Sequence, residues 1–119
     1  MLFSLAAVLL LGLSTASAAS KPSIDSISKK TTSSVTVSVL YDKYASKKVD
    51  IVVSIRNKDT DKTTQQTFSN EKLSSTGTKS VKVNNLLSGT KYSFKVKIRK
   101  HTNGNYSSWS DSQTAKTKS

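Results

Sequence analysis

The sequence predicts an all-β sandwich of seven short strands in one domain. Three observations lead to this expectation: apolar and polar residues alternate in several segments, turn-forming residues separate those segments, and no segment shows apolar spacing of three and four over a dozen residues. The chain has 119 residues, which is the length of a single domain.

The first 18 residues carry no charge and differ from the rest of the chain. An apolar run from Met1 to Leu13 is followed by the small residues Ala16, Ser17 and Ala18, as in a secretory signal peptide with cleavage after Ala18. The run is shorter than the roughly 20 residues that cross a bilayer. We therefore expect a signal peptide at 1–18 and a secreted, extracellular domain at 19–119.

The expected strands are short and follow each other along the whole domain. They cover Ile24 to Ile27, Ser34 to Val39, Val49 to Ile55, Thr63 to Phe68, Val81 to Leu86, Lys91 to Lys100 and Gln113 to Thr117. The clearest is the sixth, in which Tyr92, Phe94, Val96 and Ile98 alternate with polar and basic residues. The Thr-rich fourth segment is expected at a sheet edge.

Turn signals lie between these strands. They are Asn57-Lys58-Asp59, the segment 74–78 around Gly77, Ser88-Gly89 and Asn103-Gly104. Asn-Gly is the strongest short hairpin signal, because both residues tolerate the positive φ of a type I′ turn. We therefore expect a hairpin at Asn103-Gly104.

The titratable residues exclude most kinds of catalysis. The chain has no Cys and one His, so a zinc site is not expected. The only close acid pair, Asp59 and Asp61, is flanked by lysines in a turn, and His101 has no acidic neighbour in sequence. We expect a solvated turn, a loop histidine, no metal, no cofactor and no enzyme activity.

The net charge is +12, and part of it is ordered. Four residues alternate on the outward face of the expected sixth strand and form a basic row: Lys91, Lys95, Lys97 and Arg99. One interpretation is attraction to an acidic polysaccharide, a membrane surface or nucleic acid. The other is that the charges keep a disulfide-free domain soluble and protect its exposed sheet. The sequence leaves both open, and nucleic acid is not the partner we expect.

The segment from Leu86 to Val96 resembles the fibronectin type III signature, in which a Leu is followed six residues later by a Tyr. The segments at 32–38 and 108–117 resemble the second and last strands of that family, and the match covers residues 22 to 118. The resemblance implies a seven-stranded immunoglobulin-like β-sandwich of fibronectin type III type, with Leu86 before Tyr92 in a tyrosine corner. The sequence departs from the family at Val39, where a core Trp is usual, and at Ser88, where Pro is common.

A second resemblance concerns Tyr106-Ser107-Ser108-Trp109-Ser110. It is similar to the Trp-Ser-x-Trp-Ser box of cytokine-receptor fibronectin domains, with Tyr in place of the first Trp. The resemblance implies that the aromatic rings stack between cations of the neighbouring strand, here Lys97 and Arg99. We expect Trp109 to lie across the basic row and to support the structure.

The family layout also implies that two loops lie together at one end of the sandwich. Residues in these loops are candidates for a binding surface, since tyrosines among small polar residues are typical of binding loops: Tyr41, Tyr44, Lys47, Lys48, His101 and Tyr106. Tyrosines also fill the ends of ordinary sandwiches, and the sequence leaves both interpretations open. Asn105 begins an N-glycosylation sequon, which matters only in a host that glycosylates.

These features together predict a secreted, non-enzymatic interaction module. Its partner would be an extracellular protein, an acidic polysaccharide or a cell surface, and the domain is expected to be a monomer. Two alternatives remain open at this point. One is a cell-wall or matrix-associated structural protein without a specific site, and the other is a secreted effector.

Overall fold

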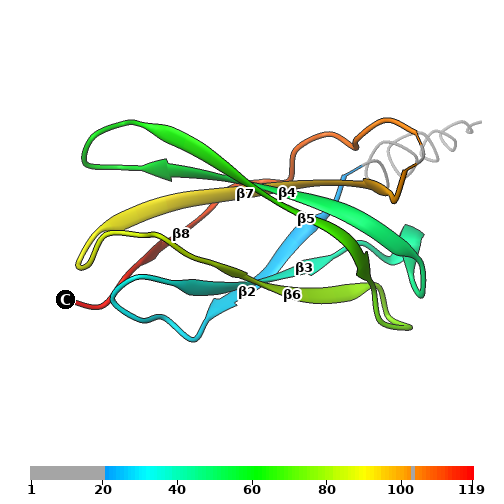
Figure 1. The fold of residues 1–119 in the computed structure, drawn as a ribbon, viewed down its shortest axis with the longest axis horizontal. Helices are drawn as coiled ribbons and strands as arrows, with labels where there is room; N and C mark the ends of the chain where they lie inside the picture. Colours follow the sequence, from blue (N-terminus) through cyan, green and yellow to red (C-terminus); the bar gives the residue numbers. More distant parts are fainter. Residues whose placement is uncertain (1–20, 103) are drawn as a thin grey trace, which may run out of the picture.

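The computed structural model describes residues 21–102 and 104–119. The expected signal peptide and Asn103 lie outside the described residues. Two antiparallel sheets pack face to face as two layers (Figure 1). One sheet has the order β2 (Ser23–Ser28), β3 (Val35–Leu40), β6 (Thr78–Val83). The other has the order β5 (Thr63–Lys72), β4 (Lys48–Asn57), β7 (Lys91–Lys100), β8 (Gln113–Lys116).

This arrangement confirms the expected all-β sandwich and the place of β5 at a sheet edge. The described residues contain one short helical turn, the 3₁₀ helix η1 (Asp42–Tyr44). β5 continues to Lys72, four residues beyond the expected end at Phe68, because a bulge keeps the strand paired with β4. At this bulge Asn70 takes a φ of 58°, which Asn tolerates better than most residues.

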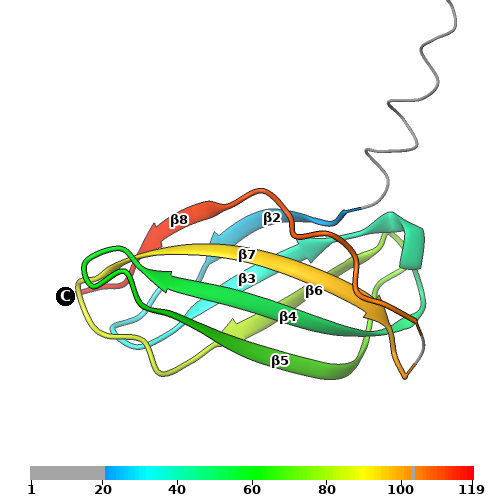
Figure 2. The same ribbon diagram turned by 90° about the horizontal axis from the view of Figure 1, so that it is seen from above.

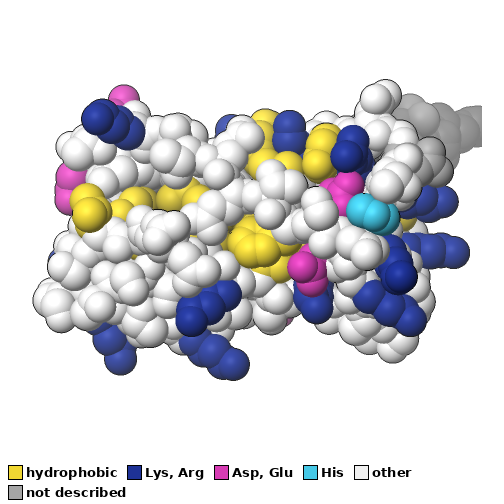
Figure 3. Space-filling model, in the orientation of Figure 1, with side chains coloured by type: hydrophobic (Ala, Val, Ile, Leu, Met, Phe, Trp, Pro, Cys, Tyr) yellow, Lys and Arg dark blue, Asp and Glu magenta, His cyan; other side chains and the backbone are white. Residues whose placement is uncertain are grey.

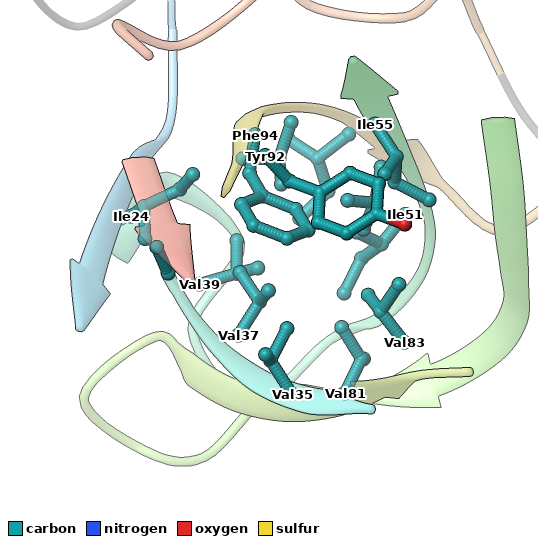
Figure 4. Close-up of a cluster of buried hydrophobic side chains, with 14 of the residues drawn as sticks. Ile24, Val35, Val37, Val39, Ile51, Ile55, Val81, Val83, Tyr92 and Phe94 are labelled. Carbon is teal, nitrogen blue, oxygen red and sulfur yellow. The ribbon is translucent and has the colours of Figure 1, made fainter. Parts of the chain in front are cut away.

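The core lies between the two sheets and is built from the alternating residues. Val35, Val37 and Val39 of β3 face the strands of the other layer, where Tyr92 and Phe94 contribute the large rings (Figure 4). The three valines and Phe94 have no more than 1% of their surface exposed. Most of the core side chains are β-branched, which suits a pleated strand and keeps side-chain rotamers few.

Tyr92 closes the core at one end. Its hydroxyl accepts a hydrogen bond from the Leu87 backbone N–H at 2.8 Å, across the turn that precedes β7. Leu86 is buried beside the ring, while Leu87 is 61% exposed. The geometry is that of a tyrosine corner.

The last strand was expected at Gln113, and β8 does begin there and pair antiparallel with β7, but a tight hairpin at Asn103-Gly104 does not form. Thr102 and Gly104 have positive φ, so the chain does turn there, but the described residues that follow form no strand until Gln113. Two serine hydroxyls of this segment, described below, occupy amide groups of β7 that a strand would have used. The segment therefore runs along β7 without forming a ladder (Figure 2).

Candidate functional site: the outer face of the four-stranded sheet

The two outer faces of the sandwich differ in charge. The positions of β4, β5, β7 and β8 that point away from the core carry eight cations: Lys48, Arg56, Lys72, Lys91, Lys95, Lys97, Arg99 and Lys116. The same positions carry one acid, Asp50, which is buried. The matching positions of the three-stranded sheet are mostly Ser and Thr, with Lys82 as the one cation among the described residues.

Four of the outward lysines form two pairs in which like charges lie directly opposite each other on neighbouring strands. Lys48 of β4 lies opposite Lys72 of β5, and Lys91 of β7 lies opposite Lys116 of β8. Directly opposite residues share one face of the sheet with Cβ atoms about 5 Å apart, and like charges there destabilise the sheet. All four side chains are exposed, and none has an ion-pair partner among the described residues. The pairs therefore oppose folding and are available to an anion.

The centre of this face is a ladder of rings and cations. The Lys97 ammonium lies 4.8 Å from the Trp109 ring centroid and 4.9 Å from that of Tyr106. Lys95 caps the far side of the ladder, 4.9 Å from Trp109, and the Arg99 guanidinium lies 4.7 Å from Tyr106. Alternate residues of one strand are roughly 6.6 Å apart, which leaves room for one ring between two cations.

Two serines hold the ladder against β7. The Ser110 hydroxyl accepts a hydrogen bond from the Val96 N–H at 2.9 Å, and the Ser110 N–H donates to the Val96 carbonyl at 2.8 Å. Ser107 repeats this with Ile98, at 3.1 Å and 2.8 Å. Each serine thus satisfies both backbone groups of one β7 residue, which fixes the two rings between the charged side chains.

A buried carboxylate anchors the end of the ladder. Asp50 is 2% exposed and accepts hydrogen bonds from Arg99 Nε at 3.0 Å and the Asn70 N–H at 3.0 Å, while His101 Nδ1 lies 2.7 Å away. Burial alone would raise the pKa of Asp50, but the contacts with His101, the Asn70 N–H and Arg99 together lower it to about 2. Figure 3 shows the histidine beside an acidic side chain. His101 lies in the turn after β7, and its acidic neighbour Asp50 is 51 residues away in the sequence.

The tyrosine loops offer less surface than expected. Tyr41 is 5% exposed and belongs to the core, because its ring packs edge-on against Tyr44 at 5.1 Å and its N–H donates to the Gly77 carbonyl. Tyr44 is half-buried against the core, and the ring of Tyr106 is engaged in the ladder. The candidate binding surface is therefore corrected at Tyr41, while Tyr44 and Tyr106 remain partly exposed.

The remaining expected site residues lie in exposed positions. Lys47 and Lys48 are exposed where the loop enters β4, and the Lys47 carbonyl accepts a hydrogen bond from Leu73. Asn105 is exposed at the turn after β7. Within residues 21–102 and 104–119, no three His, Asp or Glu side chains lie close enough together to hold a metal ion.

The basic row itself is changed by the structure. Lys91 is exposed, but Lys95, Lys97 and Arg99 are half-buried under the rings. Sequence reasoning missed Lys72, Lys116 and Asp50. Lys72 and Lys116 could be found only from the strand register, and Asp50 lies 51 residues from His101.

The fold is similar to that of several solved sandwich domains. A structure described as a myokine aligns with 84% of this chain and 98% of its own length, at a TM-score of 0.64 and 20% identity. The chicken interferon gamma receptor alpha chain aligns with 82% of this chain and 50% of its own length, at a TM-score of 0.63 and 11% identity. The sensor domain of the anti-sigma factor RsgI4 from Pseudobacteroides cellulosolvens aligns with 82% of this chain and 74% of its own (TM-score 0.58, 20% identity).

At these identities the similarity shows the fold alone. No protein-family model matches the sequence, and no curated protein matches it either. In the part of the chain that the structure describes, no helix is long and apolar enough to cross a membrane.

Proposed function

We propose that this chain is a secreted, non-enzymatic domain of fibronectin type III type that binds an acidic extracellular partner. The binding surface is the outer face of the four-stranded sheet. The observation that carries the proposal is the difference between the two outer faces, with eight outward cations on one and a single outward lysine on the described strands of the other.

A requirement for solubility alone does not account for this difference. Lysines needed only for solubility would be favourable on either face, and no benefit to folding comes from placing them opposite each other. Lys48 and Lys72 repel each other, as do Lys91 and Lys116, in the absence of a partner. An acidic ligand relieves this repulsion on binding, so the arrangement favours a charged partner over a merely solvated surface.

The kind of fold also supports a binding module. The neighbours include an interferon receptor chain and a sensor domain, both of which have the same two-layer sandwich. The tyrosine corner at Tyr92 and the ring ladder match the fibronectin type III features that the sequence resembles.

The test is binding to immobilised dextran sulfate, with neutral dextran as the reference matrix. The proposal expects retention on dextran sulfate that falls steeply with salt and no retention on neutral dextran. A face variant replaces Lys48, Lys72, Lys91 and Lys116 with Gln, and a control variant replaces Lys29, Lys30, Lys43 and Lys82 with Gln. Each variant removes four exposed positive charges.

The face variant should lose most of its retention at 0.15 M salt, whereas the control should keep most of it. Equal loss in both variants would show that net charge alone, and no particular face, causes the binding. Absence of retention in the unmodified protein at low salt would also refute the proposed function.

A further inference from the structure

We infer that the acidic partner is a linear polysaccharide that lies along β7 and contacts both lysine pairs at once. This inference rests on the proposed function and adds the class of ligand and its direction on the face. The two pairs are Lys48–Lys72 at one end of the sheet and Lys91–Lys116 at the other.

The separation of the pairs follows from the strand register. Val49 lies opposite Lys100, so Lys48 is level with His101, whose N–H donates to the Lys48 carbonyl at 3.0 Å. Lys91 begins β7 and lies ten residues before His101, which directly follows the strand, and ten residues of extended chain span roughly 33 Å. Figure 2 looks onto this face and shows β7 running its full length. A compact anion reaches one pair, whereas an extended chain reaches both.

The region between the pairs stays positive but offers no platform for stacking. Lys95 and Lys97 lie there without an ion-pair partner among the described residues, whereas Arg99 is paired with Asp50. The spacing along β7 places each ladder ring between two of these three side chains. The rings therefore have no free face for a nucleobase, which single-stranded nucleic acid would use for stacking. The rings equally cannot serve as the aromatic anchors that protein interfaces place in a partner's pocket.

The uncharged groups of this face also suit a sugar chain. Outward residues of β5 are exposed hydrogen-bonding side chains: Thr63, Gln65 and Thr67. The outward apolar residue of β4, Val52, is 4% exposed. Leu87, the exposed large hydrophobic side chain among the described residues, lies beyond the face in the turn before β7. Charges next to hydroxyl and amide groups, without apolar anchors, match a polymer of carboxylate- or sulfate-bearing sugars.

The experiment is a length series of size-fractionated dextran sulfate oligomers, measured by calorimetry with the full secreted domain. Oligomers whose extended length exceeds roughly 33 Å should bind at least about tenfold more tightly than shorter ones, because the second contact becomes intramolecular. The salt dependence should also steepen at the same length, since more charges are engaged.

Two half variants identify the contacts. In one, Lys48 and Lys72 become Gln; in the other, Lys91 and Lys116 become Gln. Each should abolish the increase in affinity at roughly 33 Å, the step in affinity with length. The affinity for short oligomers should stay within about threefold of that of the unmodified domain, because one lysine pair remains. The control pair Lys29→Gln with Lys30→Gln should retain the step.

Several outcomes would overturn the inference while leaving the proposed function standing. One is long-polymer binding that depends on the face lysines but increases smoothly with length. A second is loss of the step in only one half variant. A third is tighter binding of a single-stranded DNA oligomer of equal charge and length, which would assign the face to nucleic acid. Failure of the proposed function differs from all three, because the long polymer would then bind the face and control variants equally or not at all.

Discussion

The carboxylate of Asp50 should make the stability of this protein depend on acid in a defined range. Its pKa is lowered from 3.8 to about 2 in the folded chain, where contacts with His101, the Asn70 N–H and Arg99 outweigh the effect of burial. A folded-state pKa below the unfolded value means that the stabilisation is complete above the unfolded pKa. It is lost as the pH falls toward the folded pKa. One pKa unit corresponds to about 1.4 kcal/mol, so the contribution at pH 5 is roughly 2 to 3 kcal/mol.

The substitution Asp50→Asn removes this contribution and keeps the shape of the side chain. We expect the free energy of unfolding at pH 5 to fall by roughly 2 to 3 kcal/mol, because Arg99 and His101 lose their carboxylate partner. The difference in unfolding free energy between Asp50→Asn and the unmodified protein should narrow by roughly 1 to 2 kcal/mol between pH 5 and pH 2.5, as Asp50 becomes protonated in the unmodified protein.

Urea unfolding followed by fluorescence of Trp109, the single tryptophan, measures both free energies. Asp111→Asn is the control, since Asp111 pairs with Lys21 through a side chain that is 92% exposed. The unfolding free energy of Asp111→Asn should stay within about 0.5 kcal/mol of that of the unmodified protein across this pH range. If Asp50→Asn and the unmodified protein differ in unfolding free energy by the same amount at pH 5 and pH 2.5, the strongly lowered pKa of Asp50 is refuted.

Three further substitutions test the fold and the ladder. Tyr92→Phe should lower the free energy of unfolding by about 1 kcal/mol, because the Leu87 N–H loses its acceptor, and an unchanged melting midpoint would exclude the corner. Trp109→Ala should cost about 1 to 2 kcal/mol through two lost cation–π contacts, and a thermal melt within 1 °C of the unmodified protein would contradict it. Gly77→Ala should cost more than about 1 kcal/mol, because φ is +85° and the added Cβ would lie 2.6 Å from the Asp42 Cα; unchanged urea unfolding would refute that strain.

The strands could be predicted from the sequence because their signal is local. Val35, Val37 and Val39 alternate with small polar residues, and this pattern alone identifies an inward face. The pattern also gave the outward direction of Lys95 and Lys97 on β7. Alternation depends on the pleat of one strand and requires no knowledge of its neighbours.

The site depends on pairing between strands, which single-strand patterns do not contain. Lys72 joins the face because the bulge near Asn70 shifts the register and brings it opposite Lys48. Asp50 meets His101 only after β4 and β7 pair. Tyr41 was a candidate in a binding loop and is buried, with its N–H donating to the Gly77 carbonyl of a segment 36 residues away in the sequence.

The segment after β7 shows the same limit. Asn-Gly predicts a turn through the φ values that its residues tolerate, and the chain does turn near Gly104. Whether a strand follows depends on which groups take the β7 amides. Ser107 and Ser110 take them with their hydroxyls, and that competition is decided by tertiary contact.

The most direct test of the binding face is a ¹H–¹⁵N NMR titration of the domain with a dextran sulfate oligomer longer than roughly 33 Å, the span expected from the strand rise. The proposed face predicts that the largest amide shift changes lie on β4, β7 and β8, at both ends of the sheet, with β2, β3 and β6 little changed. Shift changes concentrated on β2, β3 and β6, or spread evenly over both sheets, would contradict it.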